Sequence, residues 1–130
     1  MARILVADDD VDIRELVEFK LSTLGHEIVA VNDGAAAVEA CREHRPDLAV
    51  LDVMMPGMSG LDAIRVIRSD PSMADIPVIL LTARAQETDV ETGFDSGADD
   101  YITKPFSPRK LVERINTILH QGTLPKQQAM

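Results

Sequence analysis

The stretch Leu48–Gly60, LAVLDVMMPGMSG, decides the fold and raises the first chemical question. It begins with an uninterrupted apolar run, Leu48–Leu51, which is typical of a strand covered on both faces of a parallel sheet. Asp52 follows this run directly. Because an unpaired carboxylate is costly to bury, the strand must end either in water or beside a group that holds this charge.

The rest of the chain alternates between strand and helix patterns. Short segments rich in β-branched residues predict strands at Arg3–Ala7, Glu27–Val31, Val78–Leu81 and Tyr101–Thr103. Helical spacing of apolar residues predicts five helices: Ile13 to Leu24, about Asp33 to Glu43, Leu61 to about Arg68, about Glu87 to Ser96, and Leu111–Leu119. The first would have Asp10 or Asp12 as N-cap and Gly25 as C-cap. The last would have Pro108 in its first turn. We expect the helix at Glu87–Ser96 to be mobile, because it holds Gly93 and mostly polar residues. This alternation predicts an α/β fold, a doubly wound five-stranded parallel sheet with helices on both faces.

The composition is that of a folded domain and narrows the range of partners. The chain has 130 residues, 45% hydrophobic and 27% charged, so we expect one domain over residues 1–121 and a short polar tail over residues 122–130. A formal net charge of −9 argues against direct contact with nucleic acid, because phosphate backbones are bound by clustered Lys and Arg. The lone Cys41, and the lack of any pattern for a signal peptide or a membrane span, lead us to expect a cytoplasmic protein.

Polar side chains follow most of the predicted strands. Asp8, Asp9 and Asp10 follow the first strand, Asp52 the third, Thr82 the fourth and Lys104 the fifth. In an open parallel sheet, the carboxyl ends of the strands share one edge, and ligands bind there beside the point where the strand order reverses. Singly, these residues have ordinary interpretations as helix caps, capping hydroxyls or solvated cations. Their conjunction favours a functional site.

Carboxylates crowded at one edge repel one another, and a divalent cation is the ordinary remedy. Mg²⁺ is the expected ion, because it takes one or two carboxylates, keeps waters and commonly shares a phosphate oxygen with its substrate. A carboxylate can also attack phosphorus to form an aspartyl phosphate, whose new charge needs a cation, an ammonium and a hydroxyl nearby. We therefore predict that Asp52 is a nucleophile held by Mg²⁺ on one side and by Lys104 on the other.

Four segments together resemble a known family. ILVADDD (Ile4–Asp10), LAVLDVMMPGMSG, VILLTAR (Val78–Arg84) and GADDYITKPF (Gly97–Phe106) are similar to the signature segments of response-regulator receiver domains, the phosphoacceptors of bacterial two-component signalling. The resemblance extends from Arg3 to about His120. It implies a flavodoxin-like fold with strand order 2-1-3-4-5, and a cis peptide bond between Lys104 and Pro105.

The resemblance also implies roles for individual residues. Asp52 would accept a phosphoryl group from a phosphohistidine of a sensor histidine kinase or a phosphotransfer protein. Thr82 would donate to that group and Lys104 would pair with it. Tyr101 would then swing inward, and the face made by the predicted helix at 87–96, the strand at 101–103 and the last helix would signal to a downstream effector or output domain. Without the resemblance, Tyr101 is interpreted as an edge-strand aromatic that packs on the preceding helix.

The metal site and the type of activity follow from the same resemblance. Asp9 would bind Mg²⁺ directly and Asp8 through water, while Asp52 and the backbone carbonyl of Met54 would be further ligands. The domain would be a signalling phosphoacceptor that catalyses only its own phosphorylation and dephosphorylation. It would not be an enzyme that acts on other substrates.

Charged residues near the predicted signalling face bear on the oligomeric state. Asp99, Asp100 and Arg114 fit the charge pairs through which regulators with winged-helix output domains dimerise, but Lys110 and Val90 depart from that pattern. We therefore expect a monomer or a weak, phosphorylation-dependent dimer.

Two alternative functions stay open at this point. A haloacid-dehalogenase-like phosphatase would use Asp8 as nucleophile, and its other active-site residues would be Asp10, Thr82, Lys104 and a second acidic pair, Asp99 and Asp100. The position of the lysine after the second acidic pair, and the lack of a role for Asp52, count against it. The second alternative is an interaction module that has kept the fold and lost the chemistry, but every reactive side chain is present.

Overall fold

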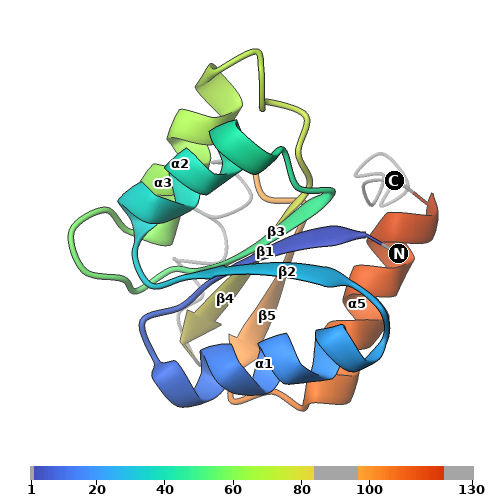
Figure 1. Cartoon of the computed structure of the whole chain (residues 1–130). Helices are drawn as coiled ribbons and strands as arrows, with labels where there is room; N and C mark the ends of the chain where they lie inside the picture. The colour runs from blue at the N-terminus through green and yellow to red at the C-terminus, as the bar shows by residue number, and fades with distance from the viewer. Residues whose placement is uncertain (1, 84–96, 122–130) are drawn as a thin grey trace, which may run out of the picture.

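Five parallel strands form one sheet in the order β2-β1-β3-β4-β5 (Figure 1). The strands are β1 (Arg3–Ala7), β2 (Glu27–Val31), β3 (Leu48–Asp52), β4 (Val78–Ala83) and β5 (Asp100–Lys104). The computed structural model describes residues 2–83 and 97–121. The predicted α/β class and strand order are confirmed. Three strands run further than predicted, so that Asp52, Thr82 and Lys104 belong to the strands themselves.

Helices cover both faces of the sheet. They are α1 (Val11–Thr23), α2 (Gly34–His44), α3 (Gly60–Ser69) and α5 (Pro108–Gln121). Figure 1 shows α2 and α3 on one side of the sheet and α1 and α5 on the other. The helix predicted at Glu87–Ser96 lies outside the described residues. Within the ranges the structure describes, no helix has the length and apolar character needed to cross a membrane.

The strands alternate between two apolar layers, as expected for a sheet buried on both sides. In β1, Ile4 and Val6 pack with the α1 and α5 side, whereas Leu5 and Ala7 pack with the α2 and α3 side. The same alternation continues in β3, where the whole of Leu48–Leu51 is inaccessible to solvent. The two layers hold the carboxyl ends of the central strands at fixed positions.

Local capping determines where the helices at that edge begin. The carboxylate of Asp10 accepts hydrogen bonds from the backbone N–H groups of Asp12 and Ile13, at 3.0 and 3.3 Å, so Asp10 is the N-cap of α1. At the other end of α1, Gly25 has a φ of +89°, which fits the predicted C-terminal glycine. The chain therefore turns sharply between Ala7 and Val11, and the acidic residues lie in that turn.

Candidate functional site

The carboxyl edge of the sheet brings together the predicted acidic residues. One carboxylate oxygen from each of Asp8, Asp9 and Asp52 lies within 4.8 Å of the others. β1 and β3 are neighbours in the sheet, although α1, β2 and α2 separate them along the chain. Asp8 and Asp52 therefore flank the point where the strand order reverses, which is where ligands bind in folds of this kind.

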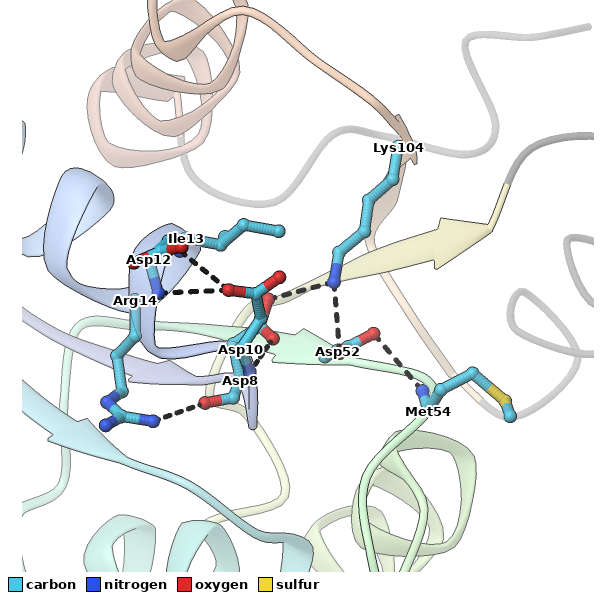
Figure 2. A network of polar contacts seen from close by, with 8 residues as sticks. All are labelled: Asp8, Asp10, Asp12, Ile13, Arg14, Asp52, Met54 and Lys104. Atoms are coloured by element: carbon cyan, nitrogen blue, oxygen red, sulfur yellow. Dashed lines mark hydrogen bonds and ion pairs between the residues drawn. The ribbon is translucent and has the colours of Figure 1, made fainter.

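Lys104 connects the two buried carboxylates (Figure 2). Its Nζ donates a hydrogen bond to Oδ2 of Asp52 at 3.0 Å. It also lies 3.0 Å from Oδ2 of Asp8, an ion pair without the angles of a hydrogen bond. Asp8 is fully buried and Asp52 is 4% exposed, so the charge at the end of β3 is held by a lysine and not by water. The peptide bond between Lys104 and Pro105 is cis, as the resemblance implied.

The protonation of this cluster reflects burial and crowding. Burial raises the pKa of Asp52 to about 6, and the charge of Asp8 adds to this effect, although Lys104 opposes it. Burial by itself lowers the pKa of Lys104, but its contacts with Asp8 and Asp52 outweigh burial, and the net pKa is raised. The ammonium is therefore charged, while the paired carboxylates are strained by mutual repulsion.

The cluster leaves hydrogen-bonding capacity unused. Oδ2 of Asp8 and Oγ1 of Thr82 are buried and have no hydrogen-bond partner among the described residues. Buried polar atoms without partners are rare and call for a specific reason. An oxygen-seeking cation beside Asp8, and an acceptor in front of Thr82, would satisfy both atoms. The residues present therefore fit Mg²⁺, whose preferred ligands are carboxylate, carbonyl and water oxygens.

The turn after β3 shapes the side of the site formed by Met54. The backbone N–H of Met54 donates to Oδ1 of Asp52 at 3.2 Å. The turn closes when the N–H of Gly60 bonds the carbonyl of Val53 at 3.0 Å. A Cβ at Gly60 would lie 2.3 Å from the carbonyl oxygen of Asp52, so only glycine allows α3 to start this close to the strand end. Met54 itself is 68% exposed.

Thr82 and Tyr101 lie on the neighbouring strands. Thr82 is 1% exposed and is paired in register with Thr103, the residue before Lys104. Tyr101 is half-buried and packs against the apolar layer on the α2 and α3 side. The switching role predicted for Tyr101 concerns a change between the unphosphorylated and phosphorylated states. The structure is that of the unphosphorylated chain.

Several polar residues take roles that the sequence did not indicate. Arg14, in the first turn of α1, donates to the backbone carbonyl of Asp8 at 2.8 Å. The sequence signal for this contact was the position of Arg14, one helical turn after the N-cap residue Asp10. Asp99 and Asp100, which fitted a dimer pattern, are paired within the chain to Arg68 and Arg114 respectively.

Comparison with known proteins gives one consistent result. A model of the response regulator receiver domain family matches residues 4–116. The DNA-binding response regulator MtrA of Mycobacterium tuberculosis (strain ATCC 25618 / H37Rv) is 45% identical over 120 residues, which are 92% of this chain and 51% of MtrA. The phosphate regulon transcriptional regulatory protein PhoB of Escherichia coli (strain K12) is 46% identical over 119 residues, with 92% of this chain and 52% of PhoB covered. The chain thus spans about half the length of these relatives.

Solved structures agree with these matches. The receiver domain of the Francisella response regulator 1452 has a TM-score of 0.84 at 34% identity, with 93% of this chain and 98% of that chain covered. The receiver domain of the sensor histidine kinase PA1611 from Pseudomonas aeruginosa PAO1, which holds a magnesium ion in its active site cleft, has a TM-score of 0.84 at 30% identity, with 92% and 98% covered. These matches give no support to the phosphatase alternative. The chain belongs to the response regulator receiver domain family and serves in two-component signal transduction.

Proposed function

We propose that Asp52 accepts a phosphoryl group from a phosphohistidine of a sensor histidine kinase or phosphotransfer protein. A carboxylate oxygen of Asp52 forms the new P–O bond as the P–N bond to the donor histidine breaks, and the electron pair stays on the donor nitrogen. The single observation that supports this most is the contact between Asp52 and Lys104, which places an ammonium beside the carboxylate that gains the phosphoryl group. The same contact orients the carboxylate before the donor arrives.

The proposed metal ligands are Asp8, Asp9, Asp52 and the backbone carbonyl of Met54. Bound Mg²⁺ would supply positive charge to the phosphoryl oxygens. Two observations support this assignment: the gathered carboxylate oxygens, and Oδ2 of Asp8, which is ion-paired with Lys104 but accepts no hydrogen bond from the described residues. Asp9 is exposed and Asp8 is not, which supports direct coordination by Asp9 and a bridging water at Asp8.

Lys104 and Thr82 would hold the phosphorylated state. The buried hydroxyl of Thr82 has no hydrogen-bond partner among the described residues and can donate to a phosphoryl oxygen, while Lys104 neutralises another. In this proposal Thr82 moves toward the group, Tyr101 follows, and the surface of β5 and α5 changes. The domain catalyses its own phosphorylation and dephosphorylation.

The partners are a donor kinase or phosphotransfer protein and a downstream effector or output domain. The named relatives, about twice as long as this chain, carry a further half that such a surface could control. We place the exchange in the cytoplasm and assign residues 1–121 to the domain, since the family match covers residues 4–116. Within the described residues Asp99 and Asp100 are satisfied by intrachain arginines, which supports a monomer or a weak dimer.

The decisive experiment labels the protein with a small phosphodonor in Mg²⁺ and maps the covalent phosphate by mass spectrometry. Wild type should carry a hydroxylamine-sensitive label on Asp52, and Asp52→Asn should carry none. Asp8→Asn should be labelled more slowly, still on Asp52.

Asp62→Asn is a matched control, because Asp62 is an exposed carboxylate on α3 that pairs with Arg65. It should behave as wild type. A label that persists in Asp52→Asn, or that maps to Asp8, would refute the proposed function.

A further inference from the structure

Arg14 lies beside the acidic turn without belonging to the carboxylate cluster (Figure 2). Its backbone N–H donates to the carbonyl of Asp10 at 2.9 Å, so it is held in the first turn of α1. From there the side chain folds back, and Nη1 donates to the backbone carbonyl of Asp8 at 2.8 Å in a partly buried contact. The guanidinium therefore joins the start of the helix to the end of β1.

The contact falls at the carboxyl end of β1, where the strand pairing ends. Pairing of β1 with β2 and β3 ends at Ala7. Beyond it, the N–H of Asp8 bonds the carbonyl of Val31 at 3.2 Å, and the carboxylate of Asp8 accepts from the N–H of Asp10 at 2.9 Å. The carbonyl of Asp8 is taken by Arg14. Each polar group of Asp8 except Oδ2 thus has a hydrogen-bond partner among the described residues.

We propose that Arg14 is a positioning residue for the metal site. By fixing the Asp8 carbonyl it fixes the peptide plane between Asp8 and Asp9, and so the directions in which these two carboxylates point. Arg14 acts through the backbone and contacts neither the ion nor the phosphoryl group. The inference rests on the proposed function, because it takes Mg²⁺ as the ligand of this cluster.

Charge and positioning predict opposite effects on metal affinity. If Arg14 acted only through its charge, it would repel Mg²⁺, and its removal would tighten binding. If it positions the ligands, its removal loosens the turn and weakens binding. Groups that orient metal ligands without contacting the metal typically contribute about tenfold or more in affinity. The direction of the change therefore separates the two roles.

The test measures the Mg²⁺ dissociation constant by calorimetry without any phosphodonor, in wild type, Arg14→Gln and Arg14→Lys. Arg14→Gln should bind Mg²⁺ about tenfold more weakly. Arg14→Lys should be intermediate, because a lysine keeps the charge but lacks the planar fork. With a small phosphodonor, the Mg²⁺ concentration for half-maximal labelling should rise in Arg14→Gln, while the rate at saturating Mg²⁺ stays within about twofold of wild type.

Arg65→Gln is the control, since it removes the same charge from an exposed arginine on α3 that pairs with Asp62. It should leave Mg²⁺ binding unchanged. Unchanged or tighter binding by Arg14→Gln would overturn the proposal. If Arg14→Gln fails to fold, Arg14→Lys decides, because a role through charge alone predicts wild-type affinity. Failure of the wild type to bind Mg²⁺ would instead refute the proposed function.

Discussion

The two edges of the sheet each hold a partly buried cation paired with an acid, but they differ in how completely their polar groups are hydrogen-bonded. At the amino edge, Arg68 and Asp99 have side chains 23% and 10% exposed. At the carboxyl edge, the side chains of Lys104 and Asp52 are 22% and 5% exposed. The side chains of Arg68 and Lys104 are almost equally exposed. The difference between the two edges therefore lies in their hydrogen bonds.

The guanidinium of Arg68 donates four hydrogen bonds within the described residues. Its guanidinium donates to the carbonyls of Gly97, Ala74 and Ile76 and to Oδ2 of Asp99, at 2.6 to 3.0 Å. Oδ2 of Asp99 also accepts from the N–H of Val78 at 2.8 Å. Gly97 makes room for the arginine, since a Cβ there would lie 3.0 Å from its Cγ. This cluster ties α3 to the starts of β4 and β5.

At the carboxyl edge, the set of hydrogen bonds among the described residues is incomplete. One lysine faces two carboxylates, and buried oxygens of Asp8 and Thr82 have no hydrogen-bond partner among the described residues. A satisfied cluster stabilises the fold, whereas an unsatisfied one costs stability and is retained where a ligand completes it. The comparison indicates that the amino edge is structural and the carboxyl edge is functional.

The largest expected effect is the loss of the amino-edge pair. Arg68→Met leaves Asp99 buried without its cation, and should lower the free energy of unfolding by about 3 kcal/mol. Urea denaturation followed by circular dichroism measures this. Arg65→Met, which breaks an exposed pair on the same helix, should cost less than about 1 kcal/mol. Equal losses in the two variants would remove the distinction between the clusters.

An effect of opposite sign, and no larger, is expected at the carboxyl edge. The pKa of Asp52 is raised from 3.8 to about 6, so between these pH values the folded protein holds a proton that the unfolded chain has lost. Stability therefore falls as the pH rises through this window. Asp52→Asn lacks the penalty, and the free energy of unfolding of this variant should exceed that of wild type by about 3 kcal/mol above pH 7.

The gain from Asp52→Asn should vanish as the pH falls well below 3.8, where Asp52 is protonated in both states. Urea denaturation in EDTA across this pH range measures it. A gain that is constant with pH would show that it does not arise from the charge of Asp52.

The smallest effect is the response to metal. At about ten times its dissociation constant, Mg²⁺ should raise the free energy of unfolding of wild type by about 1.4 kcal/mol. Arg68→Met should gain the same amount, because its lesion is at the other edge, whereas Asp8→Asn should gain less. Thermal unfolding with and without Mg²⁺ provides the measurement, and Ca²⁺ tests the preference for a small ion. An equal gain in Asp8→Asn would argue against the metal assignment.

Much of the carboxyl edge could be predicted from the sequence because its residues follow directly after strands. Asp52, Thr82 and Lys104 were located by the apolar runs before them, and parallel strands bring such positions to one edge. Boundaries were less exact: the strands extend through these residues because the backbone pairing continues after the apolar run ends. The choice between Asp10 and Asp12 as N-cap also needed the structure.

The amino edge could not be predicted, because its partners share no pattern. Arg68 ends a helix and Asp99 precedes a strand, and each looks like an ordinary surface charge in sequence. Arg14 was missed for the same reason, since its acceptor is a backbone carbonyl, which every residue has. Asp99 and Asp100 were interpreted as residues available for dimer contacts, but intrachain arginines pair with both.

The sequence by itself determined the order of strands and helices and which residues stand at the strand ends, because hydrophobic periodicity and capping are local properties. Only the tertiary structure decided which charges are paired. The distance between Lys104 and Asp52, or between Arg68 and Asp99, depends on how strands far apart in the chain pack side by side. Pairing, burial and the unused oxygens of the site are therefore properties of the folded chain.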